Sequence, residues 1–138
     1  MNVLVDTNIL VYAYDKDAGI KHNKAFQLLE QVFNGEKELY ISNQNLAELF
    51  KVLVIEKNVP IKDAKEIIMA FIFSKNWIKV SYKQETIIGA MHLYQKGFHF
   101  WDCLIAATAL ENFINIIYTE NTKDFKNISG MTAVNPLI

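Results

Sequence analysis

The segment that most constrains the fold lies near the start of the chain, where an apolar run leads directly into three polar residues. Residues 2–5 are mostly β-branched or aliphatic, and Asp6, Thr7 and Asn8 follow them. A short apolar run closed by a turn-forming triplet is typical of a buried strand in a parallel sheet. Asp6 would then lie at the carboxyl end of that strand, where open α/β sheets bind their ligands. Taken alone, Asp6 is explained equally well as the N-cap of the following helix.

Composition narrows the class of protein. The 138 residues are 51% hydrophobic and 21% charged, which predicts a single globular domain over residues 1–138. No apolar run approaches the ~20 residues of a membrane helix, and we expect no secretory signal and a cytoplasmic location. The single cysteine, Cys103, excludes an internal disulfide and a cysteine-rich zinc site. The net charge of −1 and the absence of arginine weigh against a broad nucleic-acid-binding surface and leave phosphate contacts to lysine, hydroxyl and backbone donors.

Strand and helix patterns alternate along the chain. Strands are predicted at residues 2–5, 39–41, 77–80 and 116–119, with a weaker candidate at 132–134. Helices are predicted at residues 7–14, 20–33, 43–56, 61–73, 84–95 and 101–113. This alternation implies right-handed crossovers, and we predict an α/β fold in which a mainly parallel sheet is the middle layer of an α/β/α sandwich.

One predicted helix carries an unusual apolar run. Residues from Ile67 to Phe73 are apolar on every side of the helix. Such a helix is either buried all round or presents one face to a partner, and the sequence leaves both interpretations open.

Four acidic residues are expected at the carboxyl edge of the sheet. Asp6 ends the first strand, Glu48 lies in the second turn of the helix after the second strand, Asp102 begins a later helix, and Asp124 follows the fourth strand. Each has an ordinary explanation as a helix cap or an exposed side chain. Together they would repel one another unless a cation lay between them, and an all-oxygen ligand set suits Mg²⁺ or Mn²⁺.

Four segments resemble the signature blocks of the PIN domain family, in particular the VapC toxins of bacterial and archaeal toxin–antitoxin pairs. These segments are VLVDTNIL, NLAELF, FHFWDCLIAATAL and IYTENTKDF. They occur in the family's order, and the likeness runs from about Asn2 to Phe125. The resemblance implies the PIN fold, a Mg²⁺-dependent endoribonuclease with an acidic cluster of Asp6, Glu48 and Asp102, a small antitoxin as partner, and a homodimer.

The last block departs from the family pattern. Asn121 stands where relatives often carry an acid, whereas Asp124 keeps a second acidic position. We therefore predict Asp124 as the fourth carboxylate and Asn121 as a neutral ligand or a water-holding group. Thr7 and Asn8 from the first block and Thr119 from the last are expected to support the site.

The resemblance also implies a mechanism. Asp6 and Asp102 are the main metal ligands, while Glu48 binds metal directly or through water, or acts as the base. The ions activate a water against an RNA phosphodiester, and the products carry a 5′-phosphate and a 3′-hydroxyl. The non-enzyme alternative is a degenerate PIN domain that binds RNA or protein without cleaving it, for which Asn121 is the supporting feature.

One other enzyme class and one class of signalling domain also have an aspartate at the end of a strand. At this point haloacid-dehalogenase phosphatases have a motif similar to Asp-x-Asp-x-Thr. In this chain Asn8 stands where that motif has its second aspartate. A phospho-receiver domain does not fit the order of the blocks. We set both aside.

Several residues near the predicted site receive a structural interpretation. Phe100 and Trp101 could stack on bases, but we expect them to pack in the core. His99 is expected to serve the start of its helix, and Cys103 to be small and buried. Lysines are candidates for phosphate contacts, although an ordinary exposed position is favoured for each one: Lys16, Lys21, Lys24, Lys51 and Lys123.

Overall fold

A computed structural model, which describes residues 1–138, contains one five-stranded sheet in the order β3-β2-β1-β4-β5. All of its pairings are parallel, so the predicted parallel sheet is confirmed, including the weaker fifth strand. The strands are β1 (Val3–Val5), β2 (Leu39–Ser42), β3 (Trp77–Val80), β4 (Ile116–Tyr118) and β5 (Thr132–Val134).

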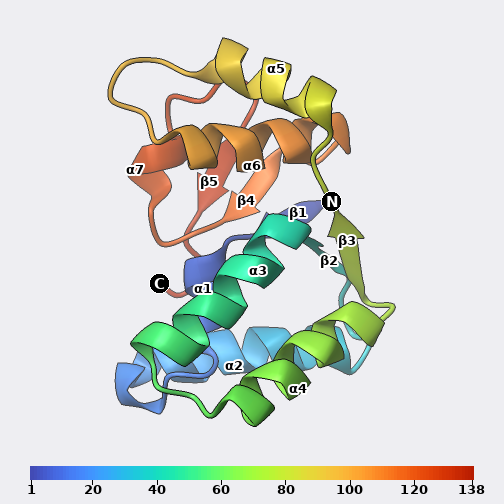
Figure 1. Cartoon of the computed structure of the whole chain (residues 1–138), viewed down its shortest axis with the longest axis vertical. Helices are drawn as coiled ribbons and strands as arrows, with labels where there is room; N and C mark the ends of the chain where they lie inside the picture. Colours follow the sequence, from blue (N-terminus) through green and yellow to red (C-terminus); the bar gives the residue numbers. More distant parts are fainter.

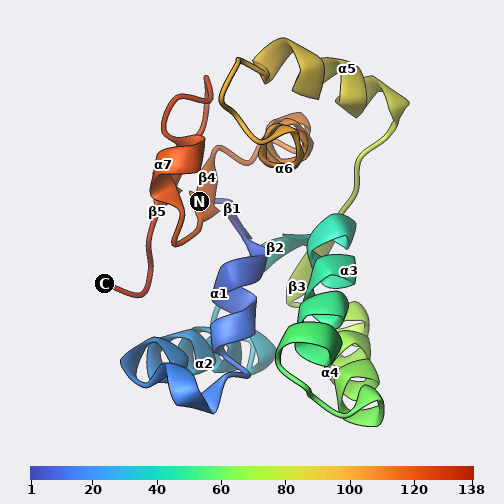
Figure 2. The same cartoon turned by 60° about the vertical axis from the view of Figure 1, so that its left-hand side comes forward.

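Helices cover both faces of the sheet. In Figures 1 and 2, α1–α4 lie on one side of the sheet and α5 and α6 lie on the other, which confirms the three-layer sandwich. None of the helices combines the length and apolar character that crossing a membrane would require. The helices are α1 (Thr7–Tyr12), α2 (Ile20–Phe33), α3 (Asn43–Lys51), α4 (Ile61–Phe73), α5 (Gln84–Leu93), α6 (Phe100–Glu111) and α7 (Thr122–Phe125).

Four predicted helices end earlier than the sequence pattern indicates. The helix predicted over residues 84–95 ends at Leu93 and the one predicted over 101–113 ends at Glu111, and the other two change type near their ends. The helix predicted to reach residue 14 ends at Tyr12, because the N–H groups of Tyr14 and Asp15 bond to carbonyls three residues back and tighten the turn. The helix predicted over residues 43–56 is α-helical only to Lys51 and continues as a π-helical turn over Val52–Glu56. A tightened turn at a helix end is common, whereas a π-helical turn is rare.

The central strand separates the two cores. Side chains alternate across a strand, so Val3 and Val5 pack with α1–α4, while Leu4 packs with α5 and α6. All three residues are buried. A strand buried on both faces must be apolar at every position, which is the pattern that the sequence shows.

The order of the strands in the sheet determines where the candidate site lies. The chain runs outward from β1 through β2 to β3 and then returns to β4 on the other side of β1. The carboxyl ends of β1 and β4 therefore meet at the switch point, where parallel α/β sheets bind ligands. The Asp6 N–H bonds to the Tyr118 carbonyl at 2.9 Å, so the residues after both strands lie side by side.

The apolar run of α4 is not buried on all sides. Phe71 is fully buried, but Met69, Ile72 and Phe73 are exposed, Phe73 to 78%. Of the two interpretations that the sequence leaves open for Ile67–Phe73, the structure therefore favours an uncovered face.

This contrast between neighbouring phenylalanines gives a stability prediction. The Phe71 ring lies 5.1 Å from that of Phe33 and 5.0 Å from that of Trp77, centroid to centroid. We expect Phe71→Ala to lower the free energy of unfolding by about 3–5 kcal/mol, because it removes a ring from a packed core. Phe73→Ala should change it by less than about 0.5 kcal/mol. Urea unfolding followed by circular dichroism checks both variants, and equal effects would contradict the placement of Phe71.

Candidate functional site

Asp6 combines the two roles that the sequence left open. It is the N-cap of α1, and its Oδ1 accepts a hydrogen bond of 2.8 Å from the Thr7 N–H. Its Oδ2 accepts a hydrogen bond of 2.9 Å from the Thr119 hydroxyl. Asp6 is only 8% exposed, yet it lines a cavity. The cap and the cavity-facing position are therefore compatible.

Thr119 connects the first and last sequence blocks. Its side chain is buried at the end of β4, where the hydroxyl donates to Asp6. The same oxygen accepts the Asn121 backbone N–H at 3.0 Å and the Asn8 side-chain N–H at 3.4 Å. The Asn8 Oδ1 in turn accepts the Glu120 backbone N–H at 3.2 Å. The expected supporting residues thus share one network with Asp6.

The sequence interpretation missed three residues near the site, and two of them, Ser42 and Asn45, hold α3 against this network. Ser42 and Asn45 form a capping box at the start of α3, and the fully buried Asn45 donates from Nδ2 to the Thr7 hydroxyl at 2.9 Å. Gln44 donates from Nε2 to Glu48 Oε1 at 3.0 Å. The Ser-x-x-Asn spacing resembles a capping box and could have marked Asn45. The i, i+4 spacing of Gln44 and Glu48 in the predicted helix could have marked Gln44.

Three of the four predicted acids line one cavity of about 360 Å³: Asp6, Glu48 and Asp102. They come from β1, α3 and α6, and Asn121 lines the same cavity. Asp124 does not line it, although its charge reaches Asp6 and Asp102. The structure therefore brings the first three acids together with Asn121, whereas Asp124 is not part of the cavity lining.

The surroundings of Asp6 and Asp102 disfavour the charged forms of their carboxyl groups. Burial raises the pKa of Asp102 to about 6, with a further contribution from the charges of Asp6 and Asp124. Burial also raises the pKa of Asp6, although hydrogen bonds from Thr119 and Thr7 oppose the rise. The carboxyl groups of Asp6 and Asp102 therefore hold their protons more tightly than an isolated aspartate does.

No lysine neutralises this cluster. One of the two ion pairs joins Lys57, which lines the cavity, to Asp15 at 3.0 Å. The other joins Lys21 to Glu120. Glu120 also accepts a hydrogen bond of 2.6 Å from the Tyr12 hydroxyl, and the pKa of Glu120 is lowered by Lys21 and Tyr12. The Lys21 ammonium, a candidate for phosphate contact, is thus already paired.

The donor set fits a hard divalent cation with several waters. No three His, Cys, Asp or Glu side chains form by themselves a group that could hold a metal ion; the acids surround the cavity instead of closing on one point. Mg²⁺ commonly retains several waters and binds through only one or two carboxylates. Oxygen donors without a lysine partner, around a cavity of about 360 Å³, suit that mode of binding.

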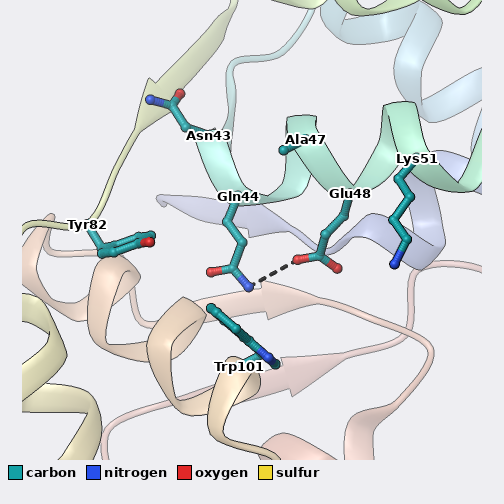
Figure 3. A pocket seen from close by; sticks show the side chains of 7 residues that line it. All are labelled: Asn43, Gln44, Ala47, Glu48, Lys51, Tyr82 and Trp101. Carbon is teal, nitrogen blue, oxygen red and sulfur yellow. Dashed lines mark hydrogen bonds between the residues drawn. The ribbon is translucent and has the colours of Figure 1, made fainter.

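The expectation that Trp101 packs in the core is wrong. Phe100 begins α6 and packs against the core, whereas Trp101 is 61% exposed. Consecutive residues on a helix point about 100° apart, so one residue of this pair faces inward and the other outward. Trp101 lines the acidic cavity and a neighbouring cavity of about 640 Å³, shown in Figure 3. Cys103 is buried as expected.

Solved structures share this fold. The chain resembles a toxin–antitoxin complex from Klebsiella pneumoniae, with a TM-score of 0.68 and 24% identity over 98% of both chains. VapBC2 from Rickettsia felis, bound to a promoter DNA fragment, has a TM-score of 0.70 and 25% identity over 98% of both chains. The sarcin–ricin loop cleaving toxin VapC20 from Mycobacterium tuberculosis has a TM-score of 0.69 and 17% identity, and the match covers 91% of this chain and 94% of that one.

Sequence comparison gives the family. No curated protein matches the chain, but the model of the PIN domain family matches residues 3–131. That range contains β1–β4, all of the helices, and every predicted site residue. The chain therefore belongs to the PIN domain family.

Proposed function

We propose that the protein is a Mg²⁺- or Mn²⁺-dependent endoribonuclease and the toxin of a toxin–antitoxin pair. The observation that carries the proposal is the cavity in which Asp6, Glu48 and Asp102 meet from separate segments without a lysine partner. Family membership and the likeness to a toxin described as cleaving the sarcin–ricin loop support cleavage of RNA. We also propose that the protein acts in the cytoplasm, because its proposed substrate is RNA.

The cation would be held by Asp6, Asp102 and Glu48, with Asn121 as a neutral ligand or water holder. Asp124, the predicted fourth carboxylate, does not line the cavity and would contribute through its charge. A bound divalent cation supplies an activated water and offsets negative charge at the scissile phosphodiester. A bound cation would also offset the burial and repulsion that raise the pKa of Asp6 and Asp102.

The protein's own contribution is orientation. The Thr7 N–H and the Thr119 hydroxyl each hold one oxygen of Asp6, so this carboxylate cannot rotate freely. Gln44 holds one oxygen of Glu48 and leaves the other without a protein partner. Glu48 is therefore placed to accept a proton from water or to bind the cation through water.

The alternative is a degenerate PIN domain that binds RNA or protein without cleavage. Asn121 supports it, since a neutral side chain occupies a position that is often acidic in relatives. The presence of Asp6, Glu48 and Asp102 in one cavity favours the enzyme.

Cleavage assays with matched charge variants test the enzyme. We expect wild type to cut RNA with Mg²⁺ but not with EDTA, and Asp6→Asn and Asp102→Asn to lower the rate more than about 100-fold, because each removes a metal ligand. Glu120→Gln is the control: it removes a nearby charge, but Tyr12 and Lys21 already occupy that side chain. It should cleave like wild type. If wild type, Asp6→Asn and Asp102→Asn behaved alike both with Mg²⁺ and with EDTA, any cleavage would not come from this site, and the degenerate domain would replace the nuclease proposal.

The raised pKa of Asp102 predicts a pH-dependent effect of Mg²⁺ on stability. Its pKa rises from an ordinary 3.8 to about 6, so the native state binds more protons between these values and its metal-free stability falls as pH rises through that window. Cation binding requires the deprotonated form. We therefore expect Mg²⁺ to raise the melting temperature more at about pH 7.5 than at about pH 5. The difference should shrink in Asp102→Asn; an equal shift at both pH values in wild type would argue against a cation at Asp102.

For the partner, we propose a small antitoxin that covers the exposed face of α4. A groove of about 360 Å³ runs where α4 meets the ends of α1 and α2, with Phe33, Ile67 and Ala70 in its lining and Asp63 and Glu66 beside them. An amphipathic segment with apolar and basic side chains fits this combination. The groove lies on the α1–α2 side of α4. A homodimer remains a proposal from the family resemblance.

Hydrogen exchange tests the partner surface. When the chain is co-expressed with the protein encoded by a neighbouring gene, we expect slower amide exchange across Ile61–Phe73 than in the free protein. The amides of α6, which lies on the other face of the sheet, serve as the internal reference. Unchanged protection across α4 in a purified complex would place the partner elsewhere.

A further inference from the structure

We propose that the cavity beside the acidic site binds one base of the substrate RNA, stacked on Trp101. This inference rests on the proposed function and names a substrate contact that the acidic residues do not provide. The cavity has a volume of about 640 Å³, and Glu48 and Trp101 line both it and the acidic cavity. A nucleotide next to the scissile phosphate would therefore reach it.

The cavity presents aromatic surface from two separate segments. Tyr82 precedes α5 and Trp101 lies in the first turn of α6, and their side chains are 43% and 61% exposed. In Figure 3, both rings border the space beside Gln44 and Glu48. Exposed aromatic rings at the edge of a nucleic-acid site are the usual platforms for unpaired bases.

The wall between these rings contains an unpaired acceptor. Gln44 Nε2 donates to the Glu48 carboxylate, which fixes the other end of the amide as the acceptor Oε1. That oxygen is buried and has no hydrogen-bond partner; the other such side-chain atom is Trp77 Nε1, in the core. Buried polar atoms are nearly always paired. An amino or imino N–H of a base is a donor suited to this oxygen.

The charge of the chain favours stacking as the source of affinity. A net charge of −1 without arginine gives no broad phosphate-binding surface. Lys51 lines the cavity and forms no ion pair, so one ammonium is available for a phosphate. With few phosphate contacts, the contact that remains for holding single-stranded RNA is the base on the aromatic face.

Binding assays in EDTA measure this contact without cleavage. The probes are fluorescently labelled single-stranded oligomers of uridine and of adenosine, and an abasic oligomer of equal length and charge, all followed by anisotropy. We expect Trp101→Ala to weaken binding of the base-bearing oligomers about tenfold or more. Trp101→Phe should retain most of the affinity, whereas Trp101→Leu should behave like Trp101→Ala because it lacks an aromatic face. The abasic oligomer should bind all of these proteins equally weakly.

The matched control is Phe113→Asn. Phe113 is 89% exposed just beyond the other end of α6 and has a φ of 59°, a conformation that asparagine tolerates well. This variant removes an exposed ring and should bind like wild type.

Any of three results would overturn the proposal: wild-type affinity in Trp101→Ala, full rescue by Trp101→Leu, or equal binding of abasic and base-bearing oligomers by wild type. If the first result came with loss of antitoxin co-purification, the surface would be a contact for protein instead of RNA. Cleavage is read separately with Mg²⁺. A wild type that shows the stacking signature without cleavage would support the base site while removing the nuclease.

Discussion

The structure depends on the pairing of β1 with β4 and on the hydrogen bond that continues this pairing beyond the sheet. The Thr119 hydroxyl donates to the carboxylate of Asp6, a residue 113 positions earlier in the chain. One step further into the sheet, the Asp6 N–H bonds to the Tyr118 carbonyl. These contacts join the first and last sequence blocks at the switch point, so an acid at the end of one strand meets the loop that follows the other.

The same arrangement is electrostatically costly for the free protein. Burial and mutual repulsion raise the pKa of Asp6 and Asp102, and the lysines that form ion pairs do so with Glu120 and Asp15 outside the cluster. A site with this character stabilises the fold only when positive charge is added. We interpret it as a site whose geometry is maintained by the surrounding hydrogen bonds and whose charge is left for a cation to balance.

The exposed apolar side chains of α4 and the exposed ring of Trp101 are likewise interpreted as surfaces that a bound molecule would cover. Along α4, Phe71 completes an aromatic core with Phe33 and Trp77, while Met69, Ile72 and Phe73 remain exposed. Burial of one side of a helix that is apolar all round leaves the other side for a partner. At the start of α6, the division between Phe100 and Trp101 leaves an aromatic ring beside the acidic cavity, in place for substrate.

The sequence by itself determined how strands and helices alternate along the chain and that the first acid follows β1. Strict apolarity at residues 3–5 is required of a strand buried on both faces, so β1 and the parallel sheet could be read from local pattern. The convergence of Asp6, Glu48 and Asp102 was expected from strand ends, because parallel strands share an edge. Tertiary structure alone decided two further features. Asn121, the N-cap of α7, lines the acidic cavity, whereas Asp124 in the first turn of that helix does not. Trp101 is exposed and lines the acidic cavity. Both features depend on where a side chain lies relative to segments that are distant in the sequence, which no local periodicity encodes.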